Sequence, residues 1–230
     1  EEEIVAYHLE RAFAYRRELG PADARSDALG RRAALRLAAA GRRAAARGDQ
    51  PAAVGLLSRA ASVGPDHGAE RAWTLYHLGM ELQEAGDEPA ALAALDEAVR
   101  LAESADDRSL EWRARITLTD VQTEVDPRSI PTATARAEIV AAIEALTELR
   151  DDAGLADAWT KIGFIDPSLS RRVRSSNILR ATCSVTPDQM CTTLLYRSDR
   201  VRAPPSWTPS GSANATPDQL RSRYVDNEGQ

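Results

Sequence analysis

The stretch AAGRRAAARGDQPAAVGLLSRAASVGP, residues 39–65, decides the fold, because it returns further along the chain as HLGMELQEAGDEPAALAALDEAVRLAE, residues 77–103. The matched positions are all separated by 38 residues. They are Gly41 with Gly79, Gly48-Asp49 with Gly86-Asp87, Pro51 with Pro89, Ala53 with Ala91, Leu57 with Leu95, and Ala60 with Ala98. A repeat of this length predicts stacked helical hairpins.

The Gly-Asp pair in the middle of each copy predicts the joint between two helices. Glycine is the preferred residue just beyond a helix end, and aspartate is a good N-cap for the next helix. Pro51 and Pro89 then fall in the first helical turn, where a missing N–H does little harm. Gly41 in the first helix and Ala53 in the second would let two antiparallel helices approach closely, and Ala60 would contact the next hairpin.

Helical periodicity extends over residues 1–165. Leu75, Leu78 and Leu82 repeat at i, i+3 and i+7, and so line one face of a helix. Strand signals are weak, because no Asn-Gly or Asp-Gly pair joins two alternating runs. The sequence therefore predicts an all-α fold. Its expected helices cover about 4–19, 25–47, 49–63, 69–85, 87–103, 110–123 and 132–150, and a last one begins near residue 155.

The repeat resembles the tetratricopeptide repeat (TPR). The first clear copy matches at Leu37, Gly41, Ala53, Leu57, Ala60 and Pro65, and the second at Leu75, Leu78, Gly79, Leu82, Ala91, Leu95 and Ala98. Residues 110–150 look like a degenerate copy with an inserted loop, Val125 to Pro131, and Trp159, Ile162 and Gly163 match the opening of a further copy. The resemblance implies a TPR-like α-solenoid of antiparallel helical hairpins over roughly residues 34–165, whose groove binds a protein or peptide.

A second resemblance concerns YHLERAFAYRRELGP (residues 7–21) followed by AGRRAAARGDQPAAVGLLSRA (residues 40–60). Together they are similar to the C-terminal helical-repeat region of bacterial STAND or AAA ATPase regulators, which are often fused to class III adenylate or guanylate cyclase or DNA-binding domains. This resemblance implies a regulatory segment of a larger signalling ATPase or transcriptional regulator. The alternative is a part of a nucleotide cyclase or ATPase enzyme whose catalytic domains lie upstream of this chain.

The 230 residues contain no recognisable catalytic, nucleotide-binding or metal-binding motif. Lys161, the sole lysine, is followed by Ile162, so there is no phosphate-binding Gly-Lys-Ser/Thr motif. His8, His67 and His77 do not show metal-ligand spacing, and Cys183 and Cys191 lack a nearby histidine. We expect no catalytic residue, no cofactor and no metal. With two cysteines, no signal peptide and no apolar run of about 18 residues, we expect a cytoplasmic protein without membrane contact.

Two groups of residues are candidates for partner binding. One is a helical stripe of arginines. Its simpler interpretation is a solvated face, and its functional interpretation is a contact with an acidic partner or a neighbouring domain. Nucleic-acid binding by the stripe is unlikely, because the net charge is −6 and no aromatic rings interleave with the arginines. The stripe comprises Arg32, Arg36, Arg43 and Arg47. The other group is aromatic and belongs to the first helices of successive hairpins, where the rings either fill the hairpin core or line the groove. It comprises Trp73, Tyr76, Trp112 and Trp159.

The composition changes after residue 165. Residues 166–230 hold ten serines, six prolines and nine arginines but one glutamate, and the helical period is lost. We therefore expect two regions, a TPR-like domain over 1–165 and a low-complexity, mostly disordered C-terminal tail over 166–230. Three explanations of the tail remain open: a natural extension, an altered reading frame after about Ile165, or a small domain of unfamiliar pattern.

Overall fold

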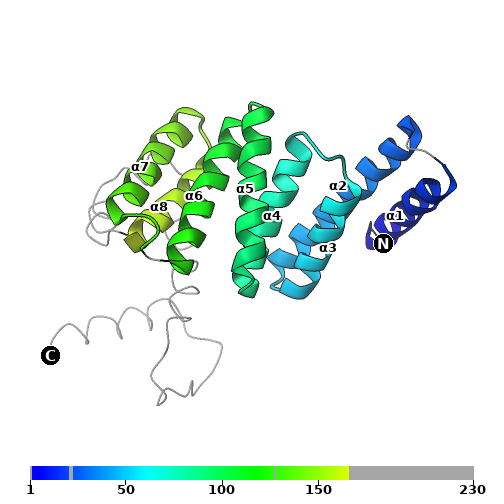
Figure 1. The fold of residues 1–230 in the computed structure, drawn as a ribbon, viewed down its shortest axis with the longest axis horizontal. Coiled ribbons are helices and arrows are strands. Elements are labelled where there is room, and N and C mark those ends of the chain that lie inside the picture. Colours follow the sequence, from blue (N-terminus) through cyan, green and yellow to red (C-terminus); the bar gives the residue numbers. More distant parts are fainter. Residues whose placement is uncertain (1, 21–22, 127, 166–230) are drawn as a thin grey trace, which may run out of the picture. The chain divides into compact units, whose positions relative to one another are not determined.

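A computed structural model of the chain describes residues 2–20, 23–126 and 128–165, which form eight α-helices (Figure 1). The helices are α1 (Glu2–Leu19), α2 (Ala24–Ala46), α3 (Gln50–Val63), α4 (Ala69–Ala85), α5 (Glu88–Ser104), α6 (Arg108–Val125), α7 (Thr132–Glu148) and α8 (Asp152–Ile165). The described part of the chain contains no strand, so the predicted all-α fold is confirmed. The predicted tail, with Cys183 and Cys191, lies outside the described residues, and the boundary at 165/166 stays a prediction.

The helix joints follow the predicted Gly-Asp chemistry. Gly48 and Gly86 have φ angles of 74° and 79°, in the left-handed region that glycine adopts without strain. The Asp49 carboxylate then accepts the N–H of Ala52 at 3.3 Å, and Asp87 accepts the N–H of Ala90 at 3.2 Å. Each aspartate therefore caps the helix that follows its glycine, and the chain reverses direction within three residues.

Two closely packed hairpins, α2–α3 and α4–α5, form the centre of the repeat. A Cβ atom added to Gly41 would lie 2.7 Å from Cγ of Leu57, and one added to Gly79 would lie 2.6 Å from Cγ of Leu95. The carbonyl oxygens of Ala53 and Ala91 lie 3.4 Å from the same two added atoms. The predicted close approach of the two helices is thus confirmed in both copies, with the same atoms in contact.

The third hairpin, α6–α7, is packed differently. Neither helix contains a glycine, and the buried side chains of α6 include Ile116 and Thr119. Thr119 donates its hydroxyl hydrogen to Oε2 of Glu138 at 2.8 Å, so a polar contact joins the two helices. The helix α7 begins after Pro131, which offers no side-chain cap. Residues 108–148 therefore form a degenerate copy of the hairpin, as the sequence predicted, with an inserted loop after α6.

Successive hairpins pack on one another in chain order. We call α2, α4, α6 and α8 first helices, and α3, α5 and α7 second helices. The second helices α3 and α5 pack on the first helices α4 and α6 that follow them, and α1 packs on α2. The first helices also contact one another, from α2 to α4, α4 to α6 and α6 to α8. The fold is thus a TPR-like α-solenoid.

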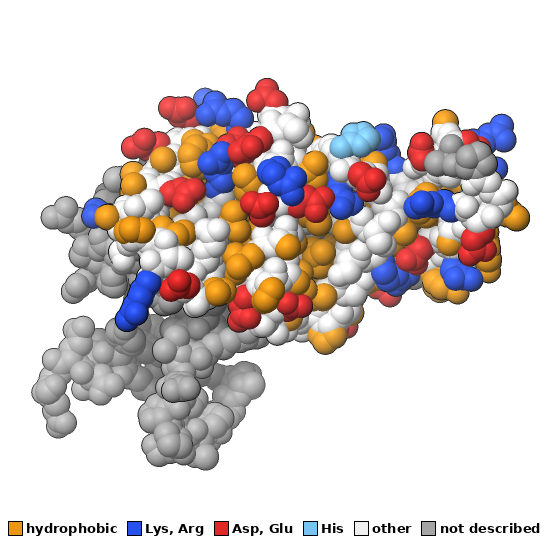
Figure 2. Space-filling view, in the orientation of Figure 1, with side chains coloured by type: hydrophobic (Ala, Val, Ile, Leu, Met, Phe, Trp, Pro, Cys, Tyr) orange, Lys and Arg blue, Asp and Glu red, His pale blue; other side chains and the backbone are white. Residues whose placement is uncertain are grey.

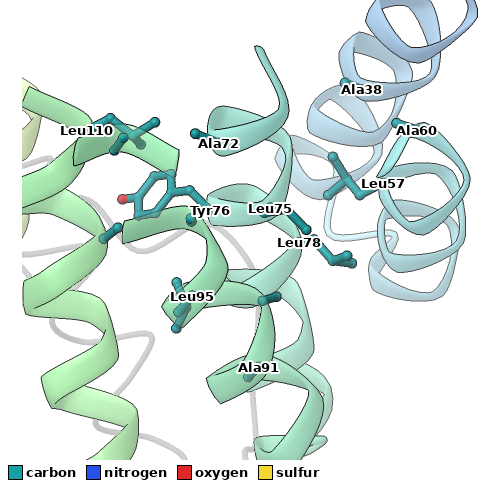
Figure 3. Packing of buried hydrophobic residues seen from close by; sticks show 14 of the residues in the cluster. Ala38, Leu57, Ala60, Ala72, Leu75, Tyr76, Leu78, Ala91, Leu95 and Leu110 are labelled. Atoms are coloured by element: carbon teal, nitrogen blue, oxygen red, sulfur yellow. The ribbon is translucent and has the colours of Figure 1, made fainter. Parts of the chain in front are cut away.

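The core is built largely from leucine and alanine. One cluster of buried residues runs from α1 to α6, and a second joins α6, α7 and α8. Figure 3 shows the middle of the first cluster, where Tyr76 extends from α4 toward Leu110 of α6, and Leu57 lies close to Ala38 and Ala60. Alanine in the contact positions brings the helix backbones close, so leucine side chains fill the remaining space.

Candidate protein-binding surface

The surface formed by the first helices, which we call the first-helix surface, brings together aromatic and charged residues from α4, α6 and α8. Its centre is Trp73 in the first turns of α4. The indole N–H donates to Oδ2 of Asp107 at 3.0 Å, and Asp107 is the residue that caps α6. The guanidinium of Arg113 lies over the indole ring, 5.5 Å from its centroid, at a distance typical of a cation–π contact. Trp73 therefore contacts α6 through both its edge and its face.

Arg113 also joins α6 to α8. Its Nε donates to Oδ2 of Asp151 at 2.6 Å, and its Nη2 donates to the other carboxylate oxygen. Asp151 precedes α8 and caps it by accepting the N–H of Gly154 at 3.0 Å, while Ser109 donates a further hydrogen bond. Burial alone would raise the pKa of Asp151, but these donors lower it to about 2. The pair is thus charged at all ordinary pH values and connects the N-terminal ends of two first helices.

His77 lies one turn after Trp73 and is uncharged at neutral pH. Its ring lies 5.9 Å from that of Trp73 and 5.3 Å from that of Tyr76, centroid to centroid. Burial lowers the pKa of His77 to about 4, and the positive charges of Arg42 and Arg113 add to the effect. We call Arg42, Trp73, His77 and Arg113 the Trp73 cluster: an indole with the guanidinium of Arg113 over it, and a neutral imidazole whose pKa the charges of Arg42 and Arg113 lower.

The predicted aromatic candidates occupy different environments. Tyr76 is 2% exposed and belongs to the core, where burial raises the pKa of its phenol. It supports Trp73 by an edge-on contact at 5.9 Å instead of meeting solvent itself. Trp112 and Trp159 are half-buried and pack against the second hydrophobic cluster. The guanidinium of Arg115 lies 5.8 Å from the ring centroid of Trp112, within the same helix. Trp73 differs from Trp112 because its charged contacts, Asp107 and Arg113, come from the next hairpin.

The arginine stripe belongs to α2 and its C-cap, and Arg42 of the Trp73 cluster is the sequence neighbour of its member Arg43. Arg32, Arg36 and Arg43 are exposed residues of α2, and Arg47 is its exposed C-cap residue. Arg31, which flanks the stripe, lies 3.7 Å from a carboxylate oxygen of Glu70 on α4. Figure 2 shows acidic and basic side chains interspersed on the face in view, a pattern typical of a solvated surface. Partner binding by these arginines stays a prediction.

The sequence did not single out Arg42, His77, Arg113 or Asp151 as one site. His77 shows no metal-ligand spacing, and Arg42 flanks the arginine stripe, so neither residue points to Arg113 or Asp151. Asp107 and Asp151 did carry a usable signal, since each is an aspartate just before a helix.

A second missed contact is buried: Lys161, 6% exposed, donates to Asp120 of α6. It fixes α8 against α6 at a point further along both helices.

The described residues contain no group of three or more histidine, cysteine, aspartate or glutamate side chains that could hold a metal ion. Within the same residues, each helix is too short or too polar to cross a bilayer.

No protein-family model matches the chain, and no curated protein matches it. Among solved structures, a kinesin light chain-like protein from Podosopora anserina with nearly identical TPR-like repeats is similar in fold. The TM-score is 0.44 at 13% sequence identity, and the match covers 86% of this chain and 89% of that one.

Proposed function

We propose that this chain is a non-catalytic scaffold that binds a protein or peptide on its first-helix surface, at the Trp73 cluster. Repeat arrays of this kind present extended surfaces built from successive helices, and each helix contributes a few side chains. The observation that carries the proposal is the position of Trp73 and His77. Both rings are half-buried, Arg113 lies over the indole, and the positive charge of the exposed residue Arg42 acts on His77.

The cluster has the composition of a binding hot spot. Tryptophan and arginine are the residues most enriched at such positions, because they combine a large apolar area with directional polar contacts. Arg113 is already paired with Asp151, so it holds the indole in place and is not the main group offered to a ligand. Arg42 is exposed and provides the positive charge for an acidic side chain of the partner. We therefore expect peptides that combine an apolar residue with a carboxylate.

The test is a selection of peptides from a displayed random library on the full chain, followed by affinity measurement with two variants. Arg42→Glu reverses the exposed charge of the cluster and should weaken the selected peptides at least about tenfold. Arg100→Glu is the matched control, because Arg100 is an exposed arginine of α5, away from the first-helix surface. Failure to enrich any peptide family, or peptides that bind both variants equally well, would contradict the proposal.

The wider context rests on the sequence resemblance. We propose that the array is a regulatory segment of a larger bacterial signalling ATPase or transcriptional regulator in the cytoplasm, and that its partner is a separate protein or a neighbouring domain of the same polypeptide. The alternative, a segment of a nucleotide cyclase or ATPase enzyme, places the catalytic residues in other domains. The genomic reading frame around the chain distinguishes these contexts, since it shows whether an ATPase or cyclase domain is encoded with it.

A further inference from the structure

A pocket of about 580 Å³, which we call the α1–α3 pocket, is lined by residues of these two helices. Its volume is within the range of small-molecule sites in proteins, about 300–1,000 Å³. Both helices pack on α2, so the pocket lies between two neighbours of one helix. It shares no residue with the Trp73 cluster, and the two are therefore separate candidate sites.

One part of the lining is apolar and closely packed on α2. It consists of Phe13, Ala14 and Val63, all half-buried. A Cβ atom added to Gly30 of α2 would lie 2.9 Å from Cε2 of Phe13 and 2.6 Å from the carbonyl oxygen of Val63. Because Gly30 has no side chain, the Phe13 ring and the end of α3 both approach the α2 backbone closely. The three helices therefore hold the apolar part of the pocket in place.

An ion pair joins the two walls of the pocket. Arg59 of α3 donates through Nε to Oε1 of Glu10 at 3.1 Å, and its Nη2 donates to the other carboxylate oxygen. The Glu10 side chain is 19% exposed, and that of Arg59 is 42% exposed. Glu10 is the one carboxylate among the lining residues, and both of its oxygens accept from Arg59. The acidic group of the lining is therefore already paired.

Two further arginines of the lining, Arg11 and Arg17, form no salt bridge within the described residues. Arg11 donates to the phenol oxygen of Tyr15 at 2.9 Å, and the guanidinium of Arg17 lies over the Phe13 ring, 5.8 Å from its centroid. Both arginines are exposed, and they are separated by about 9 Å along the helix axis. Three arginines and one glutamate give the lining a net charge of +2. The pocket thus combines an apolar part with an excess of positive charge.

We propose that the α1–α3 pocket binds a small organic anion, a free molecule that carries an acidic group on an apolar body. The body lies against Phe13, Ala14 and Val63, and the acidic group pairs with the guanidinium groups of Arg11 and Arg17. Guanidinium binds carboxylate and phosphate oxygens through paired, charge-assisted hydrogen bonds. A neutral molecule of the same shape binds through its apolar body alone, so the negative charge is what distinguishes the ligand.

The test uses two fluorescent probes with the same rings. One is 8-anilinonaphthalene-1-sulfonate (ANS), which carries a sulfonate, and the other is N-phenyl-1-naphthylamine, which is neutral. Titration of the full chain gives a Kd for each probe, and we expect ANS to bind with a Kd below about 100 μM. The double variant Arg11→Gln with Arg17→Gln should weaken ANS binding about fivefold or more and leave the Kd of the neutral probe nearly unchanged.

The matched control removes two charges outside the pocket. It is Arg100→Gln with Arg136→Gln, at exposed arginines of α5 and α7, and it should leave both Kd values unchanged. Ala14→Phe places a ring in the apolar part of the pocket, so it should weaken both probes about fivefold or more. Circular dichroism should give both double variants the Tm of the unsubstituted chain, because all of the substituted arginines are exposed.

A further measurement needs no substitution. Raising NaCl from about 50 mM to about 500 mM should weaken ANS binding to the unsubstituted chain, because salt screens the attraction between the sulfonate and the arginines, and should not weaken binding of the neutral probe. Absence of ANS binding, or ANS binding that is insensitive to salt, overturns the proposal. Equal weakening of ANS by the two double variants, equal weakening of both probes by the pocket double variant, or full ANS affinity in Ala14→Phe overturns it as well.

Discussion

Gly41 and Gly79 occupy the points of closest helix approach, and each faces a leucine that is completely buried. A methyl group at either glycine would overlap Cγ of that leucine, which has no room to move because its hairpin encloses it. Gly55 of α3 provides the opposite case, since no atom lies within 4 Å of the place where its Cβ would be. The same residue type is therefore required at two positions and merely tolerated at a third.

We accordingly predict opposite effects for two glycine substitutions. Gly79→Ala should destabilise the fold by about 1–3 kcal/mol through overpacking against Leu95. Gly55→Ala should stabilise it by about 0.5–1 kcal/mol, because alanine restricts the unfolded chain and suits a helix interior. Urea denaturation followed by circular dichroism measures both values. Equal effects of the two substitutions would show that the helices at Gly79 are not in close contact.

His77 gives a pH dependence whose sign can be worked out. Its pKa of about 4 in the folded chain is below the ordinary value of 6.5, so the unfolded chain takes up the proton at higher pH. The free energy of unfolding therefore falls as the pH drops from about 6.5 toward 4. We expect the urea midpoint to fall less between pH 7 and pH 5 in His77→Gln than in the unsubstituted chain.

His8→Gln is the matched substitution on the exposed surface of α1, and it controls for the exchange of a histidine for glutamine as such. An NMR titration that finds the His77 imidazole near its ordinary pKa would refute the assignment.

At the scale of single helices, the sequence predicted the elements well because the signals are local. Gly48-Asp49 and Gly86-Asp87 mark a helix end and a helix start within two residues, and the 38-residue offset then identified the hairpin contacts. The Trp73 cluster could not be predicted in this way. Arg113 lies 40 residues from Trp73 in the sequence, and Arg42, Trp73 and Arg113 belong to three different helices, so no local pattern aligns them.

Asp151 has two roles in positioning α8, and substitution separates them. Asp151→Ala removes the N-cap and leaves Arg113 without its partner, which should cost about 3 kcal/mol. Asp151→Asn still accepts the Gly154 N–H, so its cost should be intermediate. The free energies of unfolding measured by urea denaturation give the order of the variants. Asp96→Ala breaks an exposed pair with Arg100 on α5 and should cost less than about 0.5 kcal/mol. An Asp151→Ala cost as small as that of the control would contradict the bridging role.

At the scale of the whole described array, the two hydrophobic clusters meet in α6. Leu110, Ala114 and Val121 of α6 belong to the first cluster, while Ile116 belongs to the second with residues of α7 and α8. In a linear array, each helix is stabilised mainly by its neighbours, so damage to one cluster does not have to unfold the other. The second cluster is the smaller one, and its α6–α7 contact lacks the glycine of the other hairpins.

We therefore predict that Ile139→Ala, a cavity in the second cluster, destabilises α7 and α8 selectively. The local cost should be about 3 kcal/mol, because Ile139 is fully buried. Hydrogen exchange measured by mass spectrometry should show faster exchange in α7 and α8 and nearly unchanged exchange in α4 and α5. Leu95→Ala, in the first cluster, is the counterpart and should accelerate exchange in α4 and α5. Uniform acceleration by both substitutions would show that the array unfolds as one unit.

The buried pair of Lys161 and Asp120 has a consequence for handling the protein. Lys161 is the sole lysine of the chain, and its ammonium group is enclosed between α8 and α6. The exposed cations of the described helices are therefore guanidinium groups, which amine-reactive esters do not modify. Coupling reagents that seek primary amines should leave both the arginine stripe and the Trp73 cluster unmodified, so immobilisation through the N-terminal amine would present these surfaces to a partner in their native state.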